Sequence, residues 1–525
     1  MNPIGLLLFV CVPGPAEDWS ALPLPSLCAP VAPHAHPPAL WDGAHIRPFT
    51  PGTGNAQTGA GPRLPLATLT RMLEEDSRAH GDALEFFRGT PLLLARGSPT
   101  ALARARALLA DLERQSRALE IELVLRLRRA GAASAPSDAG PAGETALEEA
   151  QRITSGDEAF FGARTSESFV ESYAVEVAAD SGVSRPELSL CVSGTTLHVW
   201  AARMGEGGSI FLSGLFDQST LAERGSFDPD SRDLGKLEQP RLEVLQNAFA
   251  GVVESGKGLE LELQIRAGAP RWLLSLEARA SAPPKPELAD GWQLLDLAFL
   301  AHDARTLPRL GPGALFGSEF QWNEEPPAGT ALPASAVAAS LDDGRASSGS
   351  LSSSRLPPPL YWTESMLFLP RGDAPLVERA RALVRGAEAL RSRTSRVELL
   401  QGGLVARFPV VSGFAARLLA GSERPYVVGY STELAPQTWM PVPEVATAFD
   451  GLCVWLGAQD DLASAAAWSA RSAPAREITS EDARLGRLQS LSRELACQSA
   501  LVHAGEPARE LFAGAAKLSL TLRAR

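Results

Sequence analysis

The chain is poor in cysteine, in clustered basic residues and in long hydrophobic runs. Its five cysteines among 525 residues are far apart and odd in number, which argues against a disulfide framework and a CxxC metal site. The formal net charge is −12, whereas a nucleic-acid surface needs a basic face. No run of 18 apolar residues occurs, so the sequence predicts no transmembrane helix. These shortages argue against nucleic-acid binding, disulfide-stapled and helical membrane classes.

The chain is long and contains many proline and glycine residues, which interrupt helices and strands. At 525 residues it is too long for one core, and it contains 41 prolines and 46 glycines. We therefore expect two to four domains separated by linkers.

One stretch occurs twice. The segment that begins at Leu92 is repeated from Leu367, and the run Arg104–Leu108 matches Arg379–Leu383 without a gap. Each copy has the pattern of a strand, a helix and a second strand. Ser98 is a suitable N-cap, and Pro99 stands at the first helical position, where its missing N–H is tolerated.

A β-rich segment also recurs. Seven residues match at an offset of 257, and a four-residue block, Leu234–Leu237, matches Leu485–Leu488. Short alternating runs predict strands at 168–177, 188–192 and 196–202, with Ser193–Gly194 as a tight turn between the last two. Strands at this spacing favour a sandwich or a curled antiparallel sheet. The seven matches include Val170, Tyr173 and Gly194 with Val427, Tyr430 and Gly451.

The predicted fold class is α+β, with two tandem copies of a unit in which a small βαβ-type domain precedes an antiparallel β-rich domain. The predicted boundaries are 1–20 for a signal peptide, 21–65 for a flexible arm rich in Pro and Gly, 66–129 for the first α/β domain, 130–146 for a linker, 147–323 for the first β domain, 324–359 for a disordered linker, 360–402 for the second α/β domain and 403–525 for the second β domain.

The amino terminus predicts export. Ile4–Val12 is an apolar run of signal-peptide length followed by small residues; the alternative is a buried strand. We expect a periplasmic or cell-envelope location, with a cytoplasmic one as the alternative. His34, His36 and His45 lie in the arm without a partnering acid or cysteine, and we interpret them as solvated loop residues.

Several apparent motifs fail on their details. Gly251–Gly258 has the spacing of a phosphate-binding loop but lacks its hydroxyl residue and precedes a strand pattern, which favours a turn at Ser255–Gly256. Asp228 and Asp230 begin a calcium-loop pattern that Arg232 breaks, which favours a turn. His198 corresponds to Trp455 in the other copy of the sequence. A catalytic or metal-ligating role would not survive that exchange, so we interpret His198 as a packing or surface residue. We therefore predict no catalytic, cofactor-binding or metal-ligating residue.

The repeated strand–helix–strand stretch resembles the small ring-building domain of the bacterial secretins, outer-membrane ring proteins of type II and type III secretion. The residues that match are Leu93–Pro99, Leu108–Leu109, Leu112 and Ile121–Glu122. The chain is duplicated and lacks the family's C-terminal signature. The resemblance implies a ring-building type of domain and an envelope location.

We therefore expect a non-enzymatic, secretin-like envelope scaffold or assembly protein that acts through protein partners or self-association, with no cofactor and no nucleic acid. Edge strands of the α/β layers are the expected contact surfaces. The alternative is a soluble module that holds a small ligand or glycan in a cleft of the β domains. An enzyme with a site across the two copies has no motif behind it.

Overall fold

The architecture is that of a computed structural model of the whole chain. The residues it describes are 20–28, 64–89, 92–130, 144–177, 182–205, 208–230, 234–265, 269–281, 288, 290–301, 334–347, 361–363, 365–391, 393–401, 404–435, 438–459, 462–472, 476–479, 487–490, 492–503, 505, 507, 509–510 and 518–524. The expected signal peptide and the three arm histidines lie outside the described residues, apart from Ser20.

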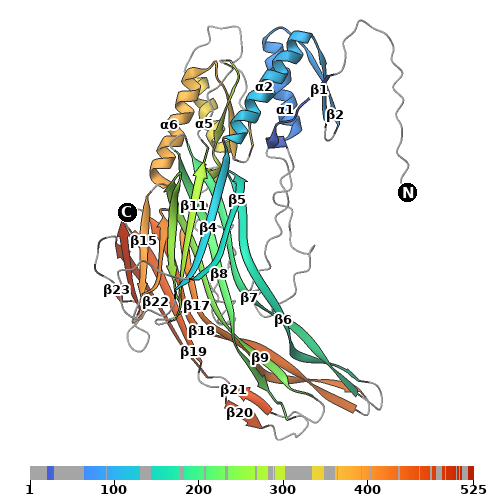
Figure 1. Cartoon of the computed structure of the whole chain (residues 1–525), viewed down its shortest axis with the longest axis vertical. Helices are drawn as coiled ribbons and strands as arrows, with labels where there is room; N and C mark the ends of the chain where they lie inside the picture. Colours follow the sequence, from blue (N-terminus) through green and yellow to red (C-terminus); the bar gives the residue numbers. More distant parts are fainter. Residues whose placement is uncertain are drawn as a thin grey trace.

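Two eight-stranded antiparallel sheets form the long body of the molecule (Figure 1). Sheet 1 has the order β23 (Arg509–Glu510), β24 (Ser519–Ala524), β15 (Thr394–Leu400), β16 (Leu404–Val411), β10 (Lys257–Leu263), β11 (Arg271–Ala280), β4 (Glu120–Ala130) and β5 (Glu144–Thr154). Sheet 2 has the order β22 (Arg493–His503), β19 (Leu462–Ser472), β18 (Thr438–Gln459), β17 (Ala415–Ala435), β9 (Leu237–Glu254), β8 (Ser209–Phe227), β7 (Gly182–Met204) and β6 (Asp157–Val177). A hairpin of β20 (Arg476–Thr479) and β21 (Arg487–Ser490) stands at the end remote from the helices.

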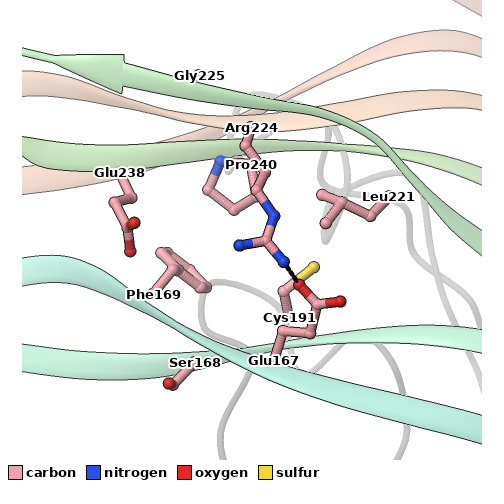
Figure 2. Close-up of a pocket in the computed structure, with 9 residues that line it drawn as sticks. All are labelled: Glu167, Ser168, Phe169, Cys191, Leu221, Arg224, Gly225, Glu238 and Pro240. Atoms are coloured by element: carbon pink, nitrogen blue, oxygen red, sulfur yellow. Dashed lines mark hydrogen bonds and ion pairs between the residues drawn. The ribbon is translucent and has the colours of Figure 1, made fainter.

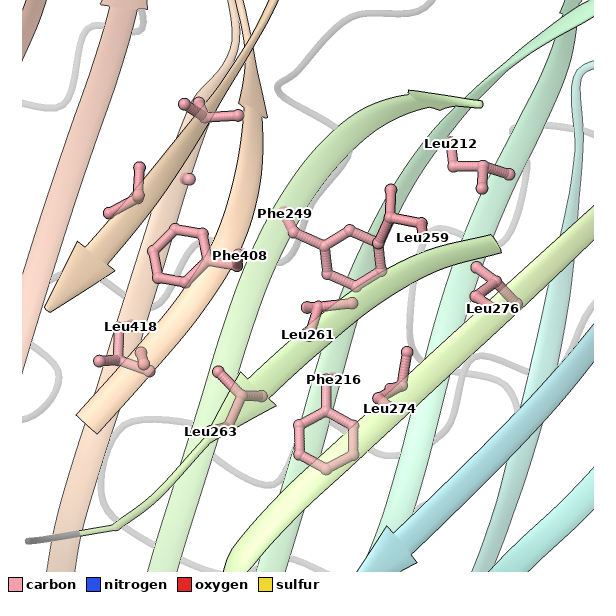
Figure 3. Packing of buried hydrophobic residues seen from close by; sticks show 14 of the residues in the cluster. Leu212, Phe216, Phe249, Leu259, Leu261, Leu263, Leu274, Leu276, Phe408 and Leu418 are labelled. Carbon is pink, nitrogen blue, oxygen red and sulfur yellow. The ribbon is translucent and has the colours of Figure 1, made fainter. Parts of the chain in front are cut away.

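The two sheets pack face to face because their strands alternate apolar and polar residues. In β4 the side chains of Ile121, Leu123, Leu125 and Leu127 are all buried in the main core. Phenylalanine and leucine side chains from both sheets meet between the layers (Figure 3). The core therefore lies between the sheets and contains residues from both copies of the sequence.

Two small caps lie at one end of the body. The first cap has the antiparallel sheet β1 (Ser20–Leu22), β3 (Leu92–Gly97) and β2 (Leu84–Gly89), the short helix η1 (Ser26–Cys28), and helices α1 (Leu66–Ala79) and α2 (Pro99–Arg117). The second cap has the sheet β12 (Trp292–Asp296), β14 (Met366–Pro370) and β13 (Tyr361–Trp362), with helices α3 (Ala298–Ala301), α5 (Ala334–Ser347) and α6 (Ala374–Arg391).

Helix α2 begins as the sequence predicts. The Ser98 hydroxyl accepts a hydrogen bond from the Ala101 N–H at 3.0 Å, and Pro99 opens the helix. Asp373 caps α6 in the same way, since its carboxylate accepts from the Leu376 N–H at 3.1 Å. The predicted cap of α2 is therefore confirmed, and the repeated helix α6 has a cap of the same kind.

The predicted fold class is wrong. The described strands pair only antiparallel, and the chain is mostly β rather than α+β built from βαβ units. Strand β3 does not pair with β4; β4 leaves the cap and pairs with β11 over ten residues. The physical reason is that alternation indicates a buried face but does not identify its partner. The apolar face of β4 packs into the core between the large sheets, with β11 and β5 paired beside it.

Two local expectations are also wrong. Ser193–Gly194 is no turn, because β7 is continuous from Gly182 to Met204. Gly194 is required instead by a positive φ of 133° and by close approach, since a Cβ there would overlap the Ala163 carbonyl oxygen. Within the range predicted as a disordered linker, residues 334–347 form helix α5, which contributes Val337 and Leu341 to a buried cluster.

Candidate assembly interface

The two copies of the sequence join side by side within each large sheet. In sheet 2, strands β6 to β9 form a first quartet, and β17, β18, β19 and β22 form a second quartet. β9 pairs with β17 over seven residues, from Ala248–Arg417 to Leu242–Glu423. In sheet 1 the corresponding contact is β10 with β16, at Glu262–Arg407 and Leu263–Ala406.

One row of paired residues shows that the quartets are alike. The row crosses the first quartet at Phe161, Leu197, Phe216 and Asn247, passes from Asn247 to Leu418, and crosses the second at Leu418, Val454, Ala467 and Gln498. The second four residues stand 257, 257, 251 and 251 positions after the first four (418−161, 454−197, 467−216, 498−247). These are the offsets at which the two sequence copies match.

The remote ends of the quartets carry the same hydrogen bonds. The Tyr173 hydroxyl donates to the Lys236 carbonyl oxygen at 3.4 Å, and Tyr430 donates to that of Arg487 at 2.8 Å. The Val170 N–H donates to the Glu238 carboxylate at 2.7 Å, and the Val427 N–H donates to the Gln489 amide oxygen at 3.0 Å. The pairing of β6 with β7 shifts register after Val170, and the pairing of β17 with β18 shifts register after the equivalent Val427.

The two caps are joined by buried polar contacts. The Arg371 guanidinium lies 3.0 Å from the Asp111 carboxylate, and both side chains are under 10% exposed. Gln115 donates to the Trp292 carbonyl oxygen and accepts from the Leu294 N–H. Helix α2 therefore covers the face of the second cap's sheet that is turned away from α6, where Phe368 is buried.

Among the described residues, each large sheet ends in strands that are paired on one side only, and these strands are equivalent to strands joined inside the chain. The remote part of β6 also contacts β18, where the Ser172 hydroxyl donates to the Pro443 carbonyl oxygen at 3.3 Å. β6 and β5 end the sheets on one side, and β22 and β23 end them on the other. On β6, Gly162, Ala163 and Thr165 are exposed, and on β22, Ala496 and Cys497 are exposed. Figure 1 shows these two pairs of strands on opposite flanks of the body.

A buried polar row crosses the outer face of the first quartet. The Arg164 guanidinium lies 2.6 Å from the Thr196 hydroxyl and 3.5 Å from the Asp217 carboxylate, and Gln246 donates to Asp217 at 3.4 Å. Burial raises the pKa of Asp217 to about 7, although Arg164, Gln246 and Arg417 lower it. Trp468 takes the place of Asp217 in the second quartet (217+251), so this row belongs to the first quartet.

A small cleft opens where β6 and β7 face β8 and β9 (Figure 2). Arg224 and Glu167 form an ion pair across it. The Cys191 thiol lies at its wall, and burial, together with the charge of Glu423, raises the pKa of that thiol to about 11. The thiol is therefore protonated at neutral pH, and the thiolate that nucleophilic chemistry needs is not formed.

The rejected motifs lie apart from one another. Ser255 and Gly256 form the turn between β9 and β10, so this prediction is confirmed. The Asp228 carboxylate accepts from the Asp230 N–H at 3.0 Å, as in an Asx turn. Arg232, which breaks the calcium-loop pattern, lies outside the described residues. His198 stacks on Phe160 at 4.2 Å and lies 3.1 Å from Glu158. In the described part of the chain, no three His, Cys, Asp or Glu side chains gather as a metal site would require.

Sequence reasoning missed the buried pairs Asp111–Arg371 and Arg164–Asp217. Both join residues far apart in the chain, and each residue alone has the pattern of a solvated charge. Arg371 is the equivalent of Arg96 in the repeated stretch, at the offset of 275 residues, but nothing near either residue in the sequence indicates which acid it would contact.

No protein-family model and no curated protein matches the chain. Among solved structures, the secretin domain β-barrel of InvG from the Salmonella SPI-1 injectisome is 16% identical with a TM-score of 0.21, over 42% of this chain and 81% of that chain. InvG in the open gate state is 14% identical with a TM-score of 0.18, over 42% and 77%. The InvG, PrgH and PrgK basal body is 15% identical with a TM-score of 0.20, over 40% and 56%. TM-scores of this size do not establish a shared fold. No helix among the described residues is long and apolar enough to cross a membrane.

Proposed function

We propose that the chain is a non-enzymatic, secretin-like scaffold or assembly protein of the cell envelope that acts through protein–protein contacts. The observation that carries the proposal is the lateral join of the two quartets. The strand edges that join one copy to the other through β9 and β17 have equivalents at both flanks of the sheet, and in the described part of the chain no further strand pairs with them. Open edges of large antiparallel sheets pair with further strands unless something covers them.

The location is tested separately from the contacts. Residues 1–25 fused to a reporter that is active only outside the cytoplasm should give reporter activity in bacteria. A silent reporter would overturn the envelope location and leave the scaffold role standing.

The rival function, a module that binds a small ligand or glycan, has the cleft of Figure 2 as its site. The ion pair between Arg224 and Glu167 already occupies the polar groups that would orient a ligand there. Binding of glycans by the wild-type chain, lost in Arg224→Ala, would favour the rival over the scaffold.

A further inference from the structure

The join inside the chain defines how a second chain can be added. Strand β17 is the equivalent of β6, and β22 is the equivalent of β9, by the offsets of 257 and 251 residues. The pair Asn247–Leu418 therefore corresponds to Gln498 of one chain opposite Phe161 of the next. The neighbouring pairs become Ala496 with Ala163 and Ala500 with Ala159.

This register places like faces together. On β6, Ala159 and Phe161 face the main core, and on β22, Val502 belongs to the same core and Ala500 packs against it. A slip by one residue would turn the core side of β22 to the outer face of the sheet. In the register taken from the internal join, the core-facing side chains of β6 and β22 therefore lie on the same side of the continued sheet.

The caps point to the same contact independently. Leu383 on α6 is 47% exposed, although its equivalent Leu108 (383−275) is buried between the first cap and Gly291. Phe87 is 55% exposed and lies opposite Leu94 on the sheet face that is turned away from α1 and α2. In the second cap the corresponding face carries Phe368 and Tyr361, which the first cap covers.

The strand edges, Leu383 on α6 and Phe87 on β2 lie on the flanks that this contact requires. Helix α6 and β22 stand on one side of the molecule, and β2 and β6 stand on the other (Figure 1). A second chain that continues sheet 2 would therefore also bring its exposed Phe87 toward Leu383 of the first.

We propose that the partner of this chain is a second copy of itself, added head to tail, with β22 of one chain pairing antiparallel with β6 of the next and Gln498 opposite Phe161. This inference rests on the proposed scaffold function and names its partner and register. Every chain contributes two copies of the unit, so the assembly contains an even number of units. Joints within a chain, between β9 and β17, then alternate with joints between chains, which no covalent linker connects. The joint between chains lacks the Asp111–Arg371 pair, because α6 has Gly386 at the position of Asp111 (111+275).

Disulfide trapping tests the register. In a Cys497→Ser background, Ala163→Cys and Ala496→Cys are made as separate full-length variants. Residues directly opposite in antiparallel strands have Cα atoms about 4.5–5.5 Å apart, within reach of a disulfide. Mixed and oxidised with copper phenanthroline, the two variants should give a disulfide-linked heterodimer, and neither variant alone should give a dimer.

The matched control is Ala500→Cys mixed with Ala163→Cys. It lies on the same face of β22 but about 13 Å further along the strand, so it should give at least tenfold less product. Each chain carries only one of the two introduced cysteines, so a disulfide between those two cysteines must join two chains.

The outcomes separate the inference from the function. Chains that associate but cross-link as well in the control, or as Ala163→Cys alone, overturn the register or the head-to-tail order and leave the scaffold role intact. Chains that neither associate nor cross-link overturn both. Leu383→Ser is a second test, because this exposed side chain is not needed for folding; it should weaken association at least tenfold, and unchanged association would contradict the cap contact.

Discussion

Asp217 offers a quantitative test of the buried polar row. Its carboxylate is about 5% exposed, and burial raises its pKa from 3.8 to about 7. A carboxyl whose pKa is higher in the folded state keeps its proton there while the unfolded chain loses it. Stability is therefore highest below about pH 4, falls as pH rises between about 4 and 7, and is constant above 7 with respect to this group. The shift of about three pKa units corresponds to about 4 kcal/mol.

The perturbation is Asp217→Asn, which removes the titration and keeps the shape. The assay is urea unfolding of both proteins at pH 5 and pH 8.5. Relative to wild type, the variant should gain about 2.7 kcal/mol on going from pH 5 to pH 8.5, because only about two of the three pKa units lie above pH 5. Comparing the two pH values cancels the change in the contact with Arg164. Glu148→Gln, at an exposed position on β5, is the control and should show no such gain. Parallel pH curves for Asp217→Asn and wild type would refute the reasoning.

Three further predictions concern the caps and the long strands. Phe87→Ser should lower the self-association constant about tenfold or more, measured by sedimentation, because it removes an apolar side chain from the proposed contact; unchanged association contradicts it. Arg371→Met should cost about 3 kcal/mol in chemical unfolding, because it leaves Asp111 buried without that cation; a change below about 1 kcal/mol would show the pair to be dispensable. Gly194→Ala should lower stability by about 2 kcal/mol or more through backbone overlap, whereas Gly372→Ala, with open space around it, should be neutral, and equal effects would contradict this explanation.

The local elements were predictable because their signals are local. The Ser98 and Asp373 caps and the turn at Ser255–Gly256 follow from neighbouring residues alone. The alternation of β4 likewise predicted a half-buried strand, although its partners were wrong.

The long strands were not predictable in the same way. β7 contains the run Ser193–Thr196, whose small polar residues are typical of a turn, yet pairing on both sides holds it extended. Gly194 and its equivalent Gly451 are conserved between the copies because each backbone passes against a carbonyl of the adjacent strand, and only the paired structure reveals this.

The sequence indicated that edge strands would form the contact surface, but it did not indicate which edge strands. Edge strands were expected as contact surfaces, in the small α/β layers. The open edges with exposed, pairing-competent residues are those of the large sheets, at β6 and β22. Which strands join depends on the β9–β17 pairing between residues about 170 apart, and no short-range pattern encodes it.

The most direct test of the scaffold claim is the mass of the full chain in solution, measured by size-exclusion chromatography with light scattering at micromolar concentrations. The open flanks predict species at whole multiples of the chain mass whose proportion rises with concentration. A single species at the mass of one chain, at every concentration up to tens of micromolar, would contradict it.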